Sequence, residues 1–506
     1  MDQPYLLPLD LRAWLPEGHL ALFVSDVVES LDLSEILQTY RRIDRRGNLG
    51  YHPVMMVKLL VYGYCTGKPS SRKLEKATWD EVPYRVLSGN QQPDHDSIAA
   101  FRQRHLKALA RLFVQVLKMC QQAGLVKLGH VAVDGTKMKA NASKHKATTL
   151  GSPRRGMSYD RMVKTEEALA KEAEALLKEA ERIDAEEDAL YGKGKRGDEL
   201  PDELKRRESR LKKIREAKAA LEAEAKAQAQ AKADEVSRRI EERERQEAET
   251  GKKMGGKPPA VPDPENTVPE PKAQRNFTDP ESRIMLDGAT KSFQQAYNTQ
   301  LAVDETAQII VGTAVTDEAN DKRQLVPVLM AVKENLGRLA ENSSADNGYF
   351  SVESITNPEL AGTSLYISVG REGKEEPLTE SPAQEQATPA REAPTQGSPP
   401  AGTSNGGATE VGNGVGETSL PSVKKQMRDK LKTAAGKAIY KMRKAIVEPV
   451  FGQIKHVRGF RQFSFRGLAK VTAEWDLVAL THNLLKLFRS GWNPKGTGYS
   501  QVVDFQ

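Results

Sequence analysis

The stretch His130-Val-Ala-Val-Asp134-Gly-Thr-Lys137 constrains the fold more than any other part of the chain, because an apolar run there ends on a carboxylate. Val131 and Val133 have the β-branched, alternating character of a buried strand, and Gly135 allows a turn directly after Asp134. Taken alone, Asp134 is more often a solvated residue that starts a turn. A carboxylate at the end of a buried strand also suits a cation at a sheet edge, and then it needs partners elsewhere in the chain.

Length and composition limit the class of protein. A chain of 506 residues is long enough for two or three domains with proper cores. Its two cysteines, Cys65 and Cys120, form no CxxC pair, which argues against a structural zinc and against a disulfide framework. No apolar run approaches the length of a membrane span, and the N-terminus lacks a signal pattern. We therefore expect a soluble, cytoplasmic protein with no membrane partner.

Residues 1–125 have the pattern of an all-α domain. Amphipathic or apolar segments of helical length follow His19, Pro53 and Asp94, and Arg and Lys gather at the turns between them. The functional interpretation is a DNA-binding domain whose basic groups contact phosphates. A plain helical bundle with a solvated basic face explains the sequence equally well.

From Ser158 the sequence changes to a heptad pattern. Apolar residues recur every seven positions, as in a coiled-coil seam, until a Gly- and Pro-containing break; a second arm then runs from about Asp202 to Thr250. We expect an antiparallel helical hairpin over 156–250, which serves either as a dimerisation or DNA-clasping arm or as a solvated spacer. The seam of the first arm consists of Met162, Leu169, Leu176, Ile183 and Leu190.

The second half alternates strand and helix patterns. A Pro-, Gly- and Lys-rich linker over 251–282 precedes it, and a segment rich in Pro, Gly, Ser, Thr and Glu, over 371–422, is expected to be disordered. The expected elements are a strand hairpin over 297–315, an amphipathic helix over 321–339, a weak strand ending on Asp346, a strand over 365–369, a basic helix over 423–451, an apolar helix over 475–489 and a tail over 491–506.

Three acidic residues stand out by position. Asp134 and Asp346 end strands, and Glu448 lies inside the basic helix, in a stretch with fourteen Lys and Arg but only two acidic residues between Lys424 and Lys470. The order of elements fits a mixed sheet whose two acidic strands lie side by side, with the basic helix packed across them. Carboxylates from separate elements are natural ligands for two Mg²⁺ ions. A salt-bridged Glu448 is the simpler alternative.

The chain resembles the DDE transposases of bacterial insertion sequences. The segments that carry the resemblance are Val133-Asp134-Gly-Thr136, Ala345-Asp346-Asn-Gly-Tyr349 and Tyr440 to Lys455, the last being similar to the Tyr–Arg–Glu–Lys signature helix of that superfamily. Tyr440 and Arg443 keep its two-residue gap, and Glu448 and Lys455 keep its six-residue gap. Four residues separate Arg443 from Glu448 where the common pattern has three, so either Arg443 or Lys444 is the matching base.

The resemblance implies an α/β fold, with an RNase H-like mixed sheet and flanking helices. This core would comprise 126–155, 283–370 and 423–490; the all-α region 1–125 precedes it, and the 156–250 hairpin and the 371–422 loop interrupt it. The resemblance also implies a metal triad of Asp134, Asp346 and Glu448, with two Mg²⁺ ions that Mn²⁺ can replace. Lys137 belongs to a basic run beside Asp134 that suits a polyanion, and Tyr440, Arg443, Lys444 and Lys455 are the further candidates for DNA contact.

The implied function is that of a transposase. It would bind the terminal inverted repeats of its element, cleave double-stranded DNA there and transfer the strands to target DNA, acting as a homodimer that pairs two ends. The alternatives are a nuclease of similar fold that cuts without joining, and a transposase-derived DNA-binding protein that has lost catalysis. A coiled-coil scaffold accounts for 158–250 and leaves the flanking domains unexplained.

Overall fold

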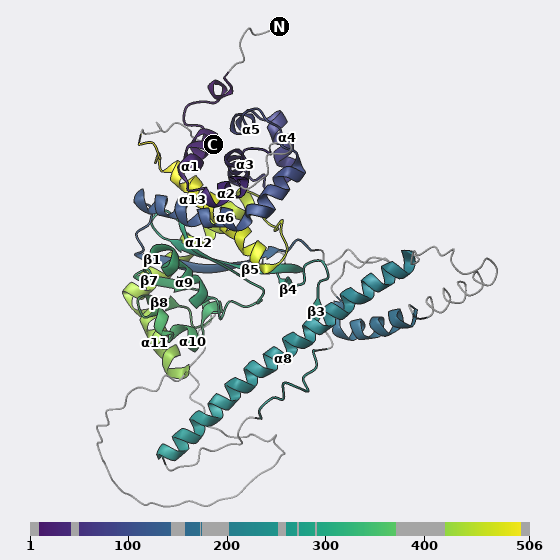
Figure 1. The fold of residues 1–506 in the computed structure, drawn as a ribbon. Helices are drawn as coiled ribbons and strands as arrows, with labels where there is room; N and C mark the ends of the chain where they lie inside the picture. The colour runs from purple at the N-terminus through teal and green to yellow at the C-terminus, as the bar shows by residue number, and fades with distance from the viewer. Residues whose placement is uncertain are drawn as a thin grey trace, which may run out of the picture.

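The computed structural model describes residues 10–41, 50–142, 157–172, 174, 202–250, 260–270, 273–288, 291–370 and 420–496. The expected disordered loop over 371–422 lies outside these residues except for 420–422, and so do the second half of the first hairpin arm and the last ten residues. In Figure 1 the N-terminal helices gather at one end, the sheet lies beside them, and one long helix projects from the body. None of the described helices is both long and apolar enough to cross a membrane.

The N-terminal region is helical, as its sequence predicts. Helix α6 begins where Asp94 accepts a hydrogen bond from the backbone N–H of Ser97 (2.8 Å), and α3 begins with Pro53, a residue favoured at the first helical position. Most side chains of α3 are buried, which agrees with its nearly continuous apolar sequence. The elements are η1 (Leu11–Trp14), α1 (Leu20–Ser30), α2 (Ser34–Arg41), α3 (Pro53–Cys65), α4 (Ser71–Asp80), α5 (Val82–Leu87) and α6 (His95–Gln122).

Within the described residues the main sheet is mixed and has six strands. Strand β1 pairs antiparallel with β5 and parallel with β7, and β7 pairs parallel with β8. The outer edge of β5 is shared by β4 and β6, both antiparallel to it. The two acidic strands therefore lie side by side, as predicted. The strands are β1 (His130–Lys139), β4 (Arg283–Leu286), β5 (Phe293–Asp304), β6 (Ile310–Thr316), β7 (Asn342–Ala345) and β8 (Ser364–Ile367).

The prediction that the first strand ends at Asp134 is wrong, because β1 continues to Lys139. Strand β5 pairs with it along this whole length, from Val131 opposite Asp304 to Lys139 opposite Ala296. Gly135 therefore forms no turn. A Cβ atom at Gly135 would lie 2.5 Å from Nε2 of Gln300, so the glycine leaves room for that side chain.

Helices cover both faces of the sheet. On one face, α9 (Leu325–Leu336) approaches so closely that a Cβ atom on Gly312 would lie 2.9 Å from the carbonyl oxygen of Val328. On the other face, α13 (Leu468–Arg489) is fixed by the indole N–H of Trp475, which donates to the carbonyl oxygen of Gln300 (3.1 Å). Helix α13 also packs against α3 and α6. The N-terminal helices and the sheet thus share one hydrophobic core.

The basic segment forms two helices, α11 (Leu420–Lys432) and α12 (Ala434–Gly452), where the sequence predicts one. Thr433 separates them and caps α12, since its hydroxyl oxygen accepts from the backbone N–H of Gly436 (3.0 Å). Pro449 cannot donate to the carbonyl oxygen of Ala445, and Nε2 of Gln308 donates to that oxygen instead (2.9 Å). A π-helical turn, η4 (Gln453–Val457), follows.

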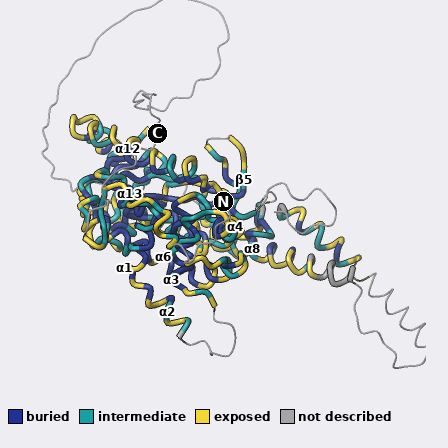
Figure 2. The backbone as a smooth tube through the Cα atoms, turned by 90° about the horizontal axis from the view of Figure 1, so that it is seen from above, coloured by how far each residue is buried: buried dark blue, intermediate teal, exposed yellow. Residues whose placement is uncertain are grey.

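Helix α8 (Asp202–Thr250) has the bounds expected for the second arm of the hairpin. It packs against a helix over 159–172 through a small apolar cluster, and Glu166 pairs with both Arg215 and Lys218 at 3.0 Å. Beyond this contact α8 projects from the body with mainly exposed or half-buried side chains (Figure 2). The turn of the hairpin lies outside the described residues, so a complete coiled-coil hairpin stays a prediction. The cluster consists of Met162, Leu169, Ile214, Ala217 and Leu221.

The expected linker over 251–282 packs into the fold at its C-terminal end. A two-stranded ribbon joins β2 (Met157–Ser158) to β3 (Gln274–Arg275). Asp279 is fully buried and accepts hydrogen bonds from the hydroxyl of Tyr297 (2.8 Å) and the backbone N–H of Gly467 (3.1 Å). These contacts tie the end of the insertion to β5 and to the start of α13. Short elements complete the fold: η2 (Asn347–Tyr349), α10 (Val352–Ile355) and η3 (Pro358–Leu360).

Candidate active site

Asp134 and Asp346 are brought to the same level by the parallel register of β1 and β7. Ala132 pairs with Ser344, and each aspartate lies two residues further along its chain. Burial raises the pKa of Asp134 to about 6, and the negative charge of Asp346 adds to this effect. The hydrogen bond from the backbone N–H of Gly135 (2.8 Å) acts in the opposite direction. The sheet thus holds two carboxylates close enough for their charges to interact.

The turn that carries Asp346 is anchored on both sides. Oδ1 of Asp346 caps η2 by accepting from the backbone N–H of Gly348 (2.9 Å). Tyr349, in the same turn, is fully buried, and its hydroxyl donates to Oε1 of Gln300 on β5. The position of Asp346 therefore depends on a hydrogen bond to a strand that is not adjacent to β7.

Helix α12 and the turn η4 supply two cations to this site. The side chain of Arg443 is only 6% exposed, and its Nη1 lies 3.6 Å from Oδ2 of Asp134. The ammonium of Lys455 donates to the hydroxyl of Thr136 and to the carbonyl oxygen of Lys137 (3.1 Å), and burial lowers its pKa. Lys444 is exposed. Of the two alternatives for the matching base, Arg443 is the one that faces the aspartates.

Glu448 is exposed on α12, and among the described residues it forms no metal-ligand group with the two aspartates. Across the described part of the chain, no three His, Cys, Asp or Glu side chains form a group that could hold a metal ion. The structure thus brings Asp134, Asp346 and Arg443 together. Lys455 of η4 contacts β1 next to them, and Glu448 stays exposed on α12.

Asp321 is a further acidic residue of the site that sequence reasoning missed. Its Oδ1 accepts from Nδ2 of Asn298 (2.7 Å) and Nε2 of Gln300 (2.8 Å) and lies 3.4 Å from the ammonium of Lys137. Its charge also contributes to the raised pKa of Asp134. The available signal was the polar pair Asn298 and Gln300, which lies on one face of β5 within its buried part.

Lys137 is half-enclosed rather than displayed on a basic surface. Its side chain is 16% exposed. Burial lowers the pKa of its ammonium, and the neighbouring Asp321 acts in the opposite direction. Lys137 and Lys455 therefore both lie within the wall of the site.

A basic groove lies between α2, α6 and α13. Its cavity of about 300 Å³ is lined by four cations and one carboxylate, Glu35, which pairs with Arg111 (3.1 Å). Arg104, Lys107 and Lys470 are exposed, and no carboxylate of the described residues lies within ion-pair distance of them. The loop that leads from η4 to α13 connects this groove to the site, since the backbone N–H of Phe463 donates to the carbonyl oxygen of Lys139 (2.9 Å) at the end of β1.

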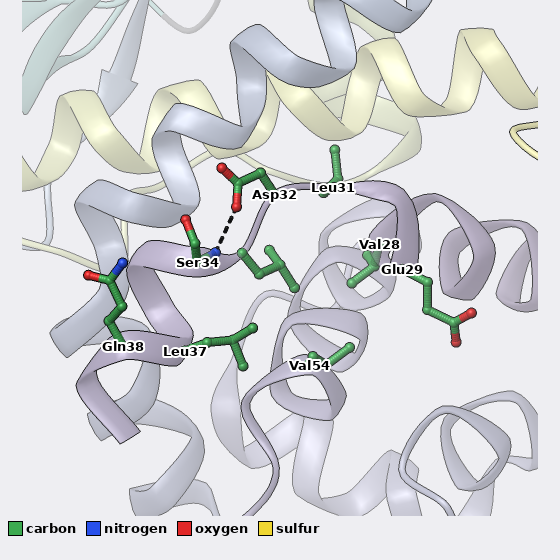
Figure 3. Close-up of a pocket in the computed structure, with 9 residues that line it drawn as sticks. Val28, Glu29, Leu31, Asp32, Ser34, Leu37, Gln38 and Val54 are labelled. Carbon is green, nitrogen blue, oxygen red and sulfur yellow. Dashed lines mark hydrogen bonds between the residues drawn. The ribbon is translucent and has the colours of Figure 1, made fainter. Parts of the chain in front are cut away.

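A separate cavity of about 380 Å³ lies between α1, α2 and α3 (Figure 3). Its walls are mainly apolar, and its two carboxylates have local partners. Oδ1 of Asp32 accepts from the backbone N–H of Ser34 (2.9 Å), and Glu29 pairs with Lys58 (2.6 Å). None of the predicted site residues lines this cavity, so it is not the acidic site.

Comparisons with known families point to one class of protein. The family described as "Transposase DDE domain" matches residues 415–488, which contain α11, α12 and most of α13. The family described as "Transposase domain (DUF772)" matches residues 9–104, the N-terminal helices. Both matches indicate an insertion-sequence DDE transposase. Glu448 lies inside a matched segment, whereas Asp134 and Asp346 lie between the two segments. No curated protein and no solved structure matches the chain.

Proposed function

We propose that this transposase cleaves DNA at the ends of its own element and joins the cut ends to target DNA, using divalent metal ions held by Asp134, Asp346 and Glu448. The observation that carries the proposal is the parallel pairing of β1 and β7, which places Asp134 and Asp346 together beside Arg443. The strand order β6-β5-β1-β7-β8, with antiparallel pairing before β1 and parallel pairing after it, supports an RNase H-like core.

The aspartate pair fits a divalent cation. Two neighbouring carboxylates, of which Asp346 raises the pKa of Asp134, provide the hard oxygen ligands that Mg²⁺ and Mn²⁺ prefer. Glu448 is assigned as the third ligand on the resemblance, and its exposure leaves it accessible to ions and DNA. Two bound ions would supply activation of the attacking oxygen and stabilisation of the leaving oxygen of a phosphodiester.

The other residues of the site stabilise its structure or contact the DNA. Arg443 balances the charge of Asp134, and Lys455 fixes η4 against β1. Tyr440 is half-buried and Lys444 exposed on α12, where they can contact DNA phosphates. Arg443, Lys137 and Lys455 lie closer to the aspartates, where a scissile phosphate would sit.

Double-stranded DNA is the proposed partner, both as the terminal inverted repeats and as the target. The groove cations Arg104, Lys107 and Lys470 would bind its backbone away from the site. Because α6 packs directly on α13, a duplex in this groove would be held at a constant distance from the aspartates. Pairing of two element ends requires a homodimer, which the resemblance implies.

The test is cleavage of a duplex that carries the terminal inverted repeat, with Mg²⁺ or Mn²⁺. We expect Asp134→Asn, Asp346→Asn and Glu448→Gln to abolish cleavage while binding stays within a few-fold of the wild type. Glu353→Gln, which changes an exposed acid on α10, is the matched control and should cut normally. Full cleavage by Asp346→Ala would refute the triad. Nicking without joined products would indicate a nuclease, and binding without nicking would indicate a DNA-binding protein that has lost catalysis.

A further inference from the structure

A buried polar network lies on β1 and β5 beside the two aspartates. Register places Gln300 across from Gly135 and Asn298 across from Lys137, so these side chains share one face of β1 and β5. Nε2 of Gln300 donates to Oδ1 of Asn298 (3.0 Å) and to Oδ1 of Asp321 (2.8 Å). Asn298, Gln300 and Tyr349 are fully buried.

Burial of this many polar groups needs a reason other than stability. A buried amide or carboxylate costs free energy unless it is hydrogen-bonded, and a fully connected network mainly specifies geometry. Here Oδ1 of Asp321 accepts from two amides and pairs with Lys137, and Oε1 of Gln300 accepts from Tyr349. The network therefore fixes the orientation of the Asp321 carboxylate.

The network also joins the two segments that carry the aspartates. The amide of Gln300 fills the space left by Gly135, next to Asp134 on β1. The same side chain holds Tyr349, in the turn that Asp346 caps. Asp321 lies close to both segments. Its Oδ1 pairs with Lys137 on β1. Its Oδ2 lies beside Gly348, in the turn after β7, at 3.6 Å from the position that a Cβ atom on this glycine would take.

We propose that Asp321 is a positioning residue of the site: through Gln300 and Lys137 it sets the spacing of Asp134 and Asp346 and thereby their affinity for a divalent cation. This inference rests on the proposed function, since it concerns the same aspartates. It assigns Asp321 no contact with DNA. Loss of such a supporting partner weakens metal binding about 10- to 100-fold in metalloproteins.

The experiment measures Mn²⁺ binding without DNA, from the electron paramagnetic resonance signal of free Mn²⁺. Binding that is lost in Asp134→Asn/Asp346→Asn defines the site. We expect Asp321→Asn to weaken that binding about 10- to 100-fold, with DNA affinity and unfolding temperature close to those of the wild type. Asp317→Asn is the matched control, because Asp317 lies in the same connection between β6 and α9 and pairs with Arg283 (3.1 Å) away from the network.

Tyr349→Phe provides a second variant that keeps the buried ring and removes one hydroxyl, and it should weaken Mn²⁺ binding in the same direction. It decides the matter if Asp321→Asn does not fold. The proposal would be overturned if both variants fold and bind Mn²⁺ as tightly as the wild type does. It would also be overturned if the wild type binds Mn²⁺ no more tightly than Asp134→Asn/Asp346→Asn does. A wild-type protein that binds Mn²⁺ at the site and cuts no DNA would refute the proposed function while leaving the positioning role intact.

Discussion

Removal of three cations from the groove between α6 and α13 should weaken DNA binding and flatten its salt dependence. The variant is Arg104→Gln/Lys107→Gln/Lys470→Gln. The three side chains are exposed, and no described carboxylate lies within ion-pair distance of them. Their replacement therefore leaves the core and the acidic site unchanged, so that a change in affinity reports the lost charges.

The magnitude follows from counterion release. Each phosphate neutralised by a cation contributes about 0.9 to the slope of log K against log salt concentration, so loss of three contacts should lower the slope by about 2.7. The DNA affinities of the wild type and the variant converge on extrapolation to about 1 M salt. At about 0.1 M salt the variant should therefore bind DNA about 500-fold more weakly than the wild type. A single true contact would give a loss of about 8-fold under the same conditions.

The assay is fluorescence anisotropy with a labelled inverted-repeat duplex over a series of salt concentrations. The control variant Lys127→Gln/Lys333→Gln/Arg338→Gln removes the same charge from exposed positions near the start of β1 and the end of α9. Its slope should parallel that of the wild type. Equal slopes for the groove variant and the wild type would refute the assignment, and equal losses in both variants would show that only net charge matters.

Two further predictions concern single residues. Burial raises the pKa of Asp476 from 3.8 to about 6, so the folded state favours the protonated acid, and about 3 kcal/mol of stability present below pH 3.8 is lost as the pH rises through about 6. In denaturant titrations, the free energy of unfolding of Asp476→Asn should therefore exceed that of the wild type by up to about 3 kcal/mol near pH 8, and the two should differ little near pH 4. A difference that stays constant across pH would contradict this. Gly135→Ala places a Cβ atom 2.5 Å from the Gln300 amide. It should lower the free energy of unfolding by about 1–3 kcal/mol and weaken Mn²⁺ binding. The control Gly124→Ala, which lies in open space but at a positive φ, should lower stability without affecting Mn²⁺ binding.

Several elements of the fold follow from local patterns in the sequence. The N-terminal helices, the strands β7 and β8 and the bounds of α8 all agree with the periodicity of apolar residues, because a helix or strand places its side chains at a fixed local interval. The positions of Asp134 and Asp346 at the ends of strand-like runs, and of Glu448 in a strongly basic helix, are also visible in the sequence.

The arrangement of the site was decided by contacts between distant segments. Pairing with β5 extends β1 past Asp134, and the packing of α12 turns Arg443 toward the aspartates while Glu448 stays exposed. Asp321 enters the site only because β5 brings Asn298 and Gln300 beneath it. Strand register and helix rotation depend on which surfaces meet in the folded chain, and such pairings over more than a hundred residues leave no periodic signal in the sequence.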